Sequence, residues 1–125
     1  MVSLGEPGAD LGVNIRDEQD TPALDRARLF VAGPVLEPDT PQEAREDVAR
    51  LAEMQVDWAK IRVGDDLGDA EKMPAKTYAA VIEAAREHNL PVAAHMVELK
   101  DAKRLVRAGA DVLAHSVRLP RWMTN

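Results

Sequence analysis

Two short apolar runs, each ending in a histidine, constrain the fold of this chain more than any other feature. The first run covers residues 91–95 and ends at His95, and the second covers 110–115 and ends at His115. Between them, apolar residues recur at helical spacing over a stretch long enough for one helix. Two buried strands joined by a helix run parallel, so their carboxyl ends meet at one edge of a sheet. The sequence therefore predicts a parallel α/β fold with both histidines at that edge.

Further strands and helices are expected in strict alternation along the chain. A third apolar run at 58–63 has Lys60 in its middle. Thr40, Pro41 and Glu43 form a capping-box pattern that predicts the start of a helix. We expect five strands, at 11–16, 28–32, 58–63, 91–95 and 110–115. We expect four helices, the first a turn or two from Thr21, the others starting near Thr40, Pro74 and Leu99.

The size and composition of the chain indicate one globular domain. Its 125 residues are 46% apolar and 30% charged, which is ordinary for such a domain. We expect a flexible lead-in at 1–10, an α/β domain at 11–117 and a truncated tail at 118–125. The net charge of −6 argues against a nucleic-acid partner, because phosphate binding needs clustered basic residues. The absence of cysteine excludes disulfides, thiol nucleophiles and Cys-ligated zinc.

The sequence gives no sign of a membrane partner or of export. No apolar stretch approaches the roughly 20 residues of a membrane span, and residues 1–10 lack the regions of a signal peptide. A cytoplasmic location is therefore the default expectation. The loop residues Asp65, Asp66 and Asp69 resemble a calcium loop only superficially, because they lack its spacing and closing glutamate. We interpret them as solvated loop residues.

Lys60, His95 and His115 are the candidate site residues. Successive βα units place their three strands side by side, so the three side chains can converge on one cavity. Neutral imidazoles bind zinc well, and an open coordination position activates water. A lysine fits such a site when it is deprotonated, or when CO2 converts it to a carbamate. The alternatives are hydrogen-bonded structural histidines and a buried lysine paired with an acid; two histidines at equivalent strand ends favour a site.

Residues 27–117 resemble the central part of the metal-dependent amidohydrolase superfamily, in its imidazolonepropionase- and prolidase-like branch. The similar segments are 12–17, 28–34, 58–63, 92–95 and 111–115. The resemblance implies that the five strands are strands 2 to 6 of a (β/α)8 TIM-type barrel. It implies that Lys60 is the carboxylated lysine of strand 4, and that His95 and His115 are metal ligands. The implied cofactor is one or two divalent metal ions, with zinc as the first candidate.

The departures from that family limit what the resemblance implies. The strand-1 His-x-His pair has no counterpart, since the first histidine is His88, and the strand-8 aspartate would lie after Asn125. A whole barrel needs roughly 250 residues. We therefore expect a fragment of an enzyme that hydrolyses a C–N bond in an amide, cyclic amide or dipeptide-like small molecule. We expect the isolated fragment to be inactive.

Two other interpretations of the sequence stay open. One is a small, open, doubly wound α/β module that binds a partner without metal, since five strands suit such a sheet. The other is a non-catalytic relic whose unpaired barrel edges favour self-association.

Overall fold

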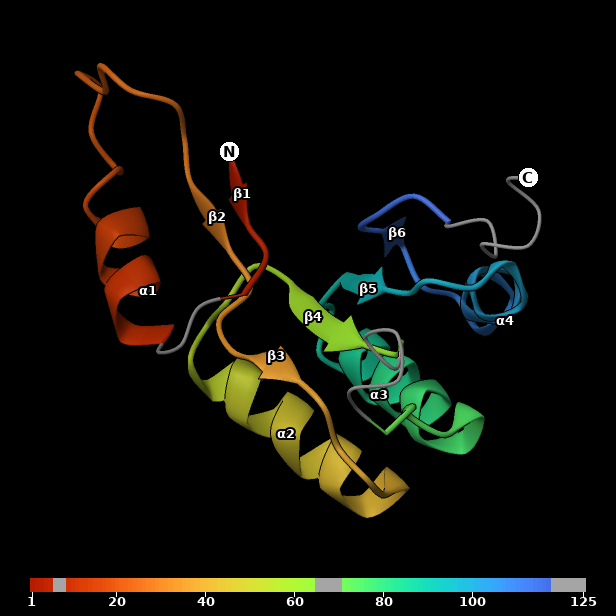
Figure 1. Cartoon of the computed structure of the whole chain (residues 1–125). Coiled ribbons are helices and arrows are strands. Elements are labelled where there is room, and N and C mark those ends of the chain that lie inside the picture. Colours follow the sequence, from red (N-terminus) through yellow and green to blue (C-terminus); the bar gives the residue numbers. More distant parts are fainter. Residues whose placement is uncertain (6–8, 65–70, 118–125) are drawn as a thin grey trace, which may run out of the picture.

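The computed structural model describes residues 1–5, 9–64 and 71–117, and Figure 1 shows their arrangement. The elements follow one another as β1 (Val2–Ser3), α1 (Ala9–Asp17), β2 (Phe30–Val31), β3 (Val35–Leu36), α2 (Pro41–Glu53), β4 (Ala59–Arg62), α3 (Ala75–Glu87), β5 (Val92–His95), α4 (Leu99–Ala108) and β6 (Val112–Leu113).

All of the paired strands in the described residues run parallel. One sheet has the order β3-β4-β5-β6, and β1 pairs with β2 in a second sheet. The two sheets meet where β2 abuts the start of β4, because the Val31 carbonyl accepts hydrogen bonds from the amides of Asp57 and Trp58, at 2.8 and 3.2 Å. The prediction of a parallel α/β fold with short strands is confirmed.

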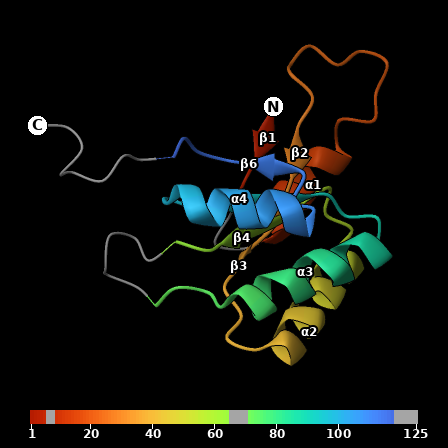
Figure 2. The ribbon, with the colours of Figure 1, turned by 90° about the vertical axis from the view of Figure 1, so that its right-hand side faces the viewer.

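The strand order decides between the two architectures that the sequence left open. Strands that follow one another in the chain are also neighbours in the sheet, from β3 to β6. Helices α2, α3 and α4 lie on the same face of that sheet (Figures 1 and 2). A doubly wound sheet instead reverses its strand order and carries helices on both faces. The doubly wound alternative is therefore wrong, and the arrangement is that of consecutive βα units of a barrel.

Local sequence signals position the helices. The Thr40 hydroxyl accepts a hydrogen bond from the Glu43 amide at 3.2 Å, which caps α2 as predicted. The Glu43 carboxylate in turn accepts from the Asp39 amide at 2.9 Å. Helix α4 ends at Gly109, whose φ of 100° lies in the left-handed region that favours glycine. These caps place the strand that follows each helix.

The core lies between the helices and one face of the sheet. In β4 and β5, alternate residues point to this face, so that the other face carries a different set of side chains. The core side of these two strands and their extensions consists of Ala59, Ile61, Val63, Val92, Ala94 and Met96. Lys60 and Arg62 on β4, and Ala93 and His95 on β5, therefore belong to the opposite face, which we call the inner face.

The structure corrects two of the predicted elements. The expected strand at 11–16 belongs to helix α1, and no helix begins at Thr21, where the chain makes a turn. The alternation of Leu11, Val13 and Ile15 suggested a strand, but only Val13 packs against the core cluster, while Leu11 and Ile15 are exposed. From the last turn of α1, the Arg16 guanidinium reaches the Asp57 carboxylate at 3.2 Å. This contact, across 41 positions of the chain, ties the end of α1 to the residues just before β4.

Two short strands were not predicted. β1 lies within the segment expected to be a lead-in and pairs with β2, and β3 follows the turn at Gly33 and Pro34. Each has only two residues, too few for a sequence pattern. The tail at 118–125 and the aspartates of the 65–69 loop lie outside the described residues. Within the described part of the chain, no helix has the length and apolarity needed to cross a membrane.

Candidate functional site

The two predicted histidines come together at the carboxyl edge of the sheet. His95 is the last residue of β5, and His115 follows β6, the neighbouring strand. Their ring centroids lie 4.8 Å apart, and the ring planes make an angle of 71°, an edge-to-face contact. His95 is half-buried and His115 is exposed. The prediction that the ends of these two strands bring their imidazoles together agrees with this geometry.

Lys60 lies on the inner face of the adjacent strand β4. In register it stands between Val35 of β3 and Ala93 of β5. Lys60 is 4% exposed, and its Nζ is buried without a hydrogen-bond partner among the described residues. Burial lowers the pKa of the Lys60 ammonium below its usual value, and the nearby charge of Arg62 lowers it further. This amine is therefore easier to deprotonate than a surface lysine.

Lys60 is on the same face as His95, but it lies two residues closer to the amino end of its strand than the level of His95. His95 pairs in register with Arg62, two residues beyond Lys60. Two residues of a strand correspond to about 6.6 Å along its axis. Lys60 therefore lies beneath the imidazoles, deeper in the inner face, and Arg62 is the β4 residue level with His95.

Arg62 and Glu37 are site residues that the sequence reasoning did not single out. The Arg62 guanidinium lies 3.3 Å from the carboxylate of Glu37, which directly follows β3. Both side chains are partly exposed. Strand alternation carried the signal for Arg62, since a residue two positions after Lys60 points to the same face. No strand alternation in the sequence indicated Glu37, because β3 is only two residues long.

A cavity of about 360 Å³ opens at this carboxyl edge. Its wall includes Glu37, Arg62, Gly64 and Lys72. A Cβ at Gly64 would lie 3.6 Å from Nε2 of His95. Gly64, a residue of the cavity wall, therefore also lies close to the His95 ring.

A second cluster of charges includes Lys72, which also lines this cavity. Lys72 contacts the buried carboxylate of Asp101 and lies 3.5 Å from Glu98, at the start of α4. Burial would lower the pKa of Lys72, but the hydrogen bond and the charge of Asp101 outweigh that effect and raise it. The cluster joins the segment before α3 to α4.

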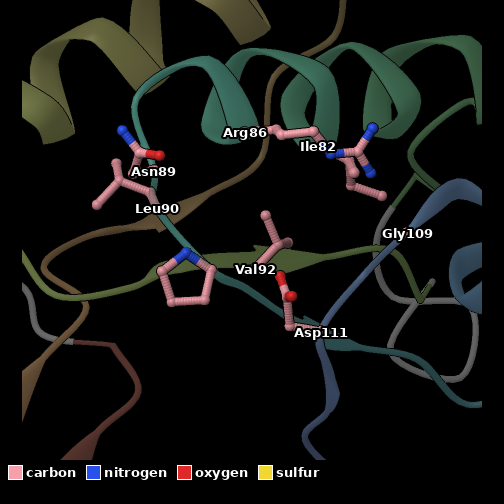
Figure 3. Close-up of a pocket in the computed structure, with 8 residues that line it drawn as sticks. Ile82, Arg86, Asn89, Leu90, Val92, Gly109 and Asp111 are labelled. Atoms are coloured by element: carbon pink, nitrogen blue, oxygen red, sulfur yellow. Dashed lines mark hydrogen bonds between the residues drawn. The ribbon is translucent and has the colours of Figure 1, made fainter.

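The opposite edge of the sheet also has a pocket, of about 300 Å³, shown in Figure 3. There the Asp111 carboxylate accepts a hydrogen bond from the Val92 amide at 2.7 Å. A Cβ at Gly109 would meet the end of the Arg86 side chain. Residues at the amino-terminal edge of parallel βα units serve stability rather than chemistry. We assign this pocket a structural role.

Comparison with solved structures relates this geometry to known proteins. A candidate prolidase from Bifidobacterium longum superposes with a TM-score of 0.74 and 26% sequence identity, over 88% of this chain and 30% of that one. The chain therefore resembles part of the fold of a candidate prolidase, over 30% of that protein's length. The prediction of a partial barrel built of parallel βα units is confirmed. No family model matches the sequence, and no curated protein matches it significantly.

Two further solved structures share the fold. A Xaa-Pro dipeptidase with methionine bound in its active site has a TM-score of 0.75 and 20% identity, over 88% of this chain and 35% of that one. A protein described as an amidohydrolase has a TM-score of 0.63 and 18% identity, over 87% of this chain and 35% of that one. The chain thus spans about a third of the structures that it matches.

The residues at the carboxyl edge suit a divalent metal in part. Two imidazoles in contact and a buried, unpartnered amine form a donor set that a metal with nitrogen preference accepts. Among the described residues, no three His, Cys, Asp or Glu side chains gather in a group that could hold a metal ion. Lys60 therefore has to contribute if the described residues are to offer a third ligand.

Proposed function

We propose that this chain is the central part of a metal-dependent amidohydrolase. Its substrate would be a small molecule with a C–N bond in an amide, cyclic amide or dipeptide-like group. The single observation that carries the proposal is the contact between His95 and His115 at the carboxyl edge, with buried Lys60 on the same face. Likeness to a candidate prolidase, a Xaa-Pro dipeptidase and an amidohydrolase supports this reaction class.

In this proposal His95 and His115 hold a divalent metal, with zinc as the first candidate. Neutral imidazoles are the required form, and the edge-to-face contact of the two rings leaves them close enough to share one ion. When bound, the metal polarises the substrate carbonyl and lowers the pKa of a water molecule. The chain's part is to fix both rings at adjacent strand ends, next to a cavity that a substrate can enter.

Lys60 contributes as a carbamate in this proposal. Its lowered pKa favours the neutral amine, which is the form that attacks CO2. A bond forms between Nζ and the carbon of CO2 while one C–O π bond opens onto its oxygen, and one proton passes from Nζ to solvent water. The product carries a carboxylate-like group in place of the unpartnered amine, and its negative charge would face Arg62 on the same strand. An oxygen donor is then available beside the two imidazoles.

We propose further that the 125-residue chain alone does not turn over substrate. The active site of a (β/α)8 barrel is built from loops after many strands, and this chain spans about a third of the structures that it matches. Metal binding, rather than turnover, is therefore the property to measure.

Zinc titration of the metal-free chain tests the proposal. We expect heat of binding by calorimetry, together with shifted imidazole resonances of His95 and His115. His95→Ala and His115→Ala should each weaken zinc binding by about tenfold or more, since each removes one of two nitrogen ligands. His88→Ala is the matched control, because His88 is exposed at the end of α3 and should not affect binding.

Either of two results would contradict the proposal. One is zinc binding that His95→Ala leaves unchanged. The other is a chain in which His88→Ala weakens binding as much as the two site variants do, because the metal would then bind to surface imidazoles without preference.

A further inference from the structure

Helix α4 carries an exposed stripe of three residues, Leu99, Lys103 and Val106. They follow one another at the spacing that places side chains on one side of a helix. Leu99 and Val106 are 55% and 58% exposed, although both are apolar. Ala108 lies on the opposite side of the helix, where it borders a pocket lined by residues of α3. This α4 stripe therefore faces away from α3 and toward solvent.

Helix α1 carries a stripe of the same form, made of Leu11, Ile15 and Glu18. Leu11 and Ile15 are 69% and 41% exposed. The Glu18 amide donates a hydrogen bond to the Asn14 carbonyl at 3.1 Å, so helical geometry continues to Glu18, just after the last residue of α1. Val13, on the other side of this helix, packs against the core cluster. The α1 stripe therefore faces away from the core, and its charged residue is acidic where that of the α4 stripe is basic.

The two stripes stand at opposite ends of the molecule (Figure 1). At these ends lie β1, which precedes α1, and β6, which follows α4, and each pairs with a single strand among the described residues. Both strands carry an exposed valine, Val2 and Val112. Exposed Asp20 adds negative charge shortly after the α1 stripe, and exposed Arg107 adds positive charge next to the α4 stripe. The two ends thus offer apolar surface with charges of opposite sign.

We infer that the occupant of each stripe is a second copy of this chain, with the α4 stripe of one copy packed against the α1 stripe of the next. The apolar residues of the two stripes then cover one another, and Lys103 faces Glu18. Two α4 stripes cannot pair in this way, because cations would meet cations. The contact is therefore head-to-tail, and it leaves one free stripe at each end of the assembly. The expected product is a series of oligomers in place of one closed dimer.

The charge of the chain favours a second copy over a lipid surface as this occupant. A basic amphipathic helix is also typical of proteins that bind anionic membranes. The net charge of −6 opposes such a surface, and two exposed apolar side chains on α4 give it little area to bury. A second copy supplies the apolar cover and the counter-charge together, at matching helical spacing. This gives the interpretation of self-association at unpaired edges two defined surfaces, and neither metal nor turnover enters it.

Sedimentation velocity over a series of protein concentrations tests this inference on the metal-free 125-residue chain. We expect the weight-average sedimentation coefficient to rise with concentration. Sodium chloride should reduce this rise, because the Debye length falls from about 30 Å at 0.01 M to about 10 Å at 0.1 M and exposed charges are then screened.

Charge reversal at the two stripes gives the specific test. Lys103→Glu and Glu18→Lys should each raise the dissociation constant about tenfold or more, because each places like charges across the contact. A mixture of the two variants should associate again, since the two reversed stripes carry opposite charges, as do the two native ones. Lys76→Glu and Glu87→Lys are the matched controls, because they make the same changes at exposed positions of α3 and should associate like the native chain.

Three results would overturn the inference. One is a native chain that stays monomeric at every concentration. Another is association that survives both charge reversals, because a different surface would then carry it. The third is binding to phosphatidylserine vesicles that Lys103→Glu abolishes, without self-association, which would assign the α4 stripe to a lipid surface. A variant that has merely unfolded would not associate again on mixing. Lys103→Glu should leave zinc binding unchanged, so this inference and the proposed function fail separately.

Discussion

Replacing Lys60 by methionine should stabilise the metal-free chain, although Lys60 is a candidate ligand. Its Nζ is buried and has no hydrogen-bond partner among the described residues. A buried donor without a partner costs about 1–3 kcal/mol, and more when it is charged. Methionine keeps an unbranched chain that packs in the same place. We therefore expect Lys60→Met to raise the free energy of unfolding by about 1–3 kcal/mol at neutral pH.

Urea denaturation followed by circular dichroism measures this change. The buffer should contain neither metal nor bicarbonate, so that the lysine stays unmodified. Lys76→Met is the control, because Lys76 is exposed on α3 and a surface substitution changes stability by no more than about 0.5 kcal/mol. A Lys60→Met chain that is less stable than the native chain would refute the reasoning, since Lys60 would then have a stabilising partner.

Burial of Lys60 also fixes the sign of a pH effect on stability. Burial lowers the folded-state pKa of Lys60 below its usual value of 10.5. Between the folded-state pKa and 10.5, the unfolded chain binds more protons than the folded chain, so stability rises with pH in that window. The advantage of Lys60→Met should therefore shrink as the pH approaches 10.5. An advantage that stays constant across this range would contradict the assigned cause.

Two predictions concern the scaffold that holds the site. Leu105→Ala should lower the free energy of unfolding by about 2–5 kcal/mol, because Leu105 on α4 is fully buried and its truncation leaves a cavity. Urea denaturation measures this change. A decrease well under that range would mean that the core collapses around the substituted side chain. Thr40→Ala should lower the free energy of unfolding by about 1 kcal/mol, because it removes the hydroxyl that caps α2. An unchanged midpoint of urea denaturation would show that the cap does not contribute to stability.

The sequence predicted the segments whose signals are local. The helix from Thr40 has a cap, a proline at its first position and a regular apolar stripe, and all three are found in α2. The strand that ends at His95 is a continuous apolar run, and it is buried as expected in β5. The segment at 11–16 lacks a set of local signals that all predict the same element. Its alternating apolar residues are typical of a strand, whereas the structure places it in helix α1.

In the candidate site, too, the residues with a local sequence signal were predicted and a residue without one was not. Lys60, His95 and His115 were found from the sequence because each lies on or directly after a recognisable apolar strand. Glu37 was not found, because β3 has two residues and owes its conformation to its pairing with β4. A strand of that length has too few side chains to show a period.

The sequence by itself determined the alternation of parallel strands and helices, and therefore which side chains stand at strand ends. Apolar periodicity and helix caps are properties of neighbouring residues, so they can be interpreted without the fold. Only the tertiary structure decided that His95 meets His115, that Arg62 stands level with His95, and that Lys60 lies below them without a partner. These relations depend on the register between strands, which hydrogen bonds and packing across the sheet fix together.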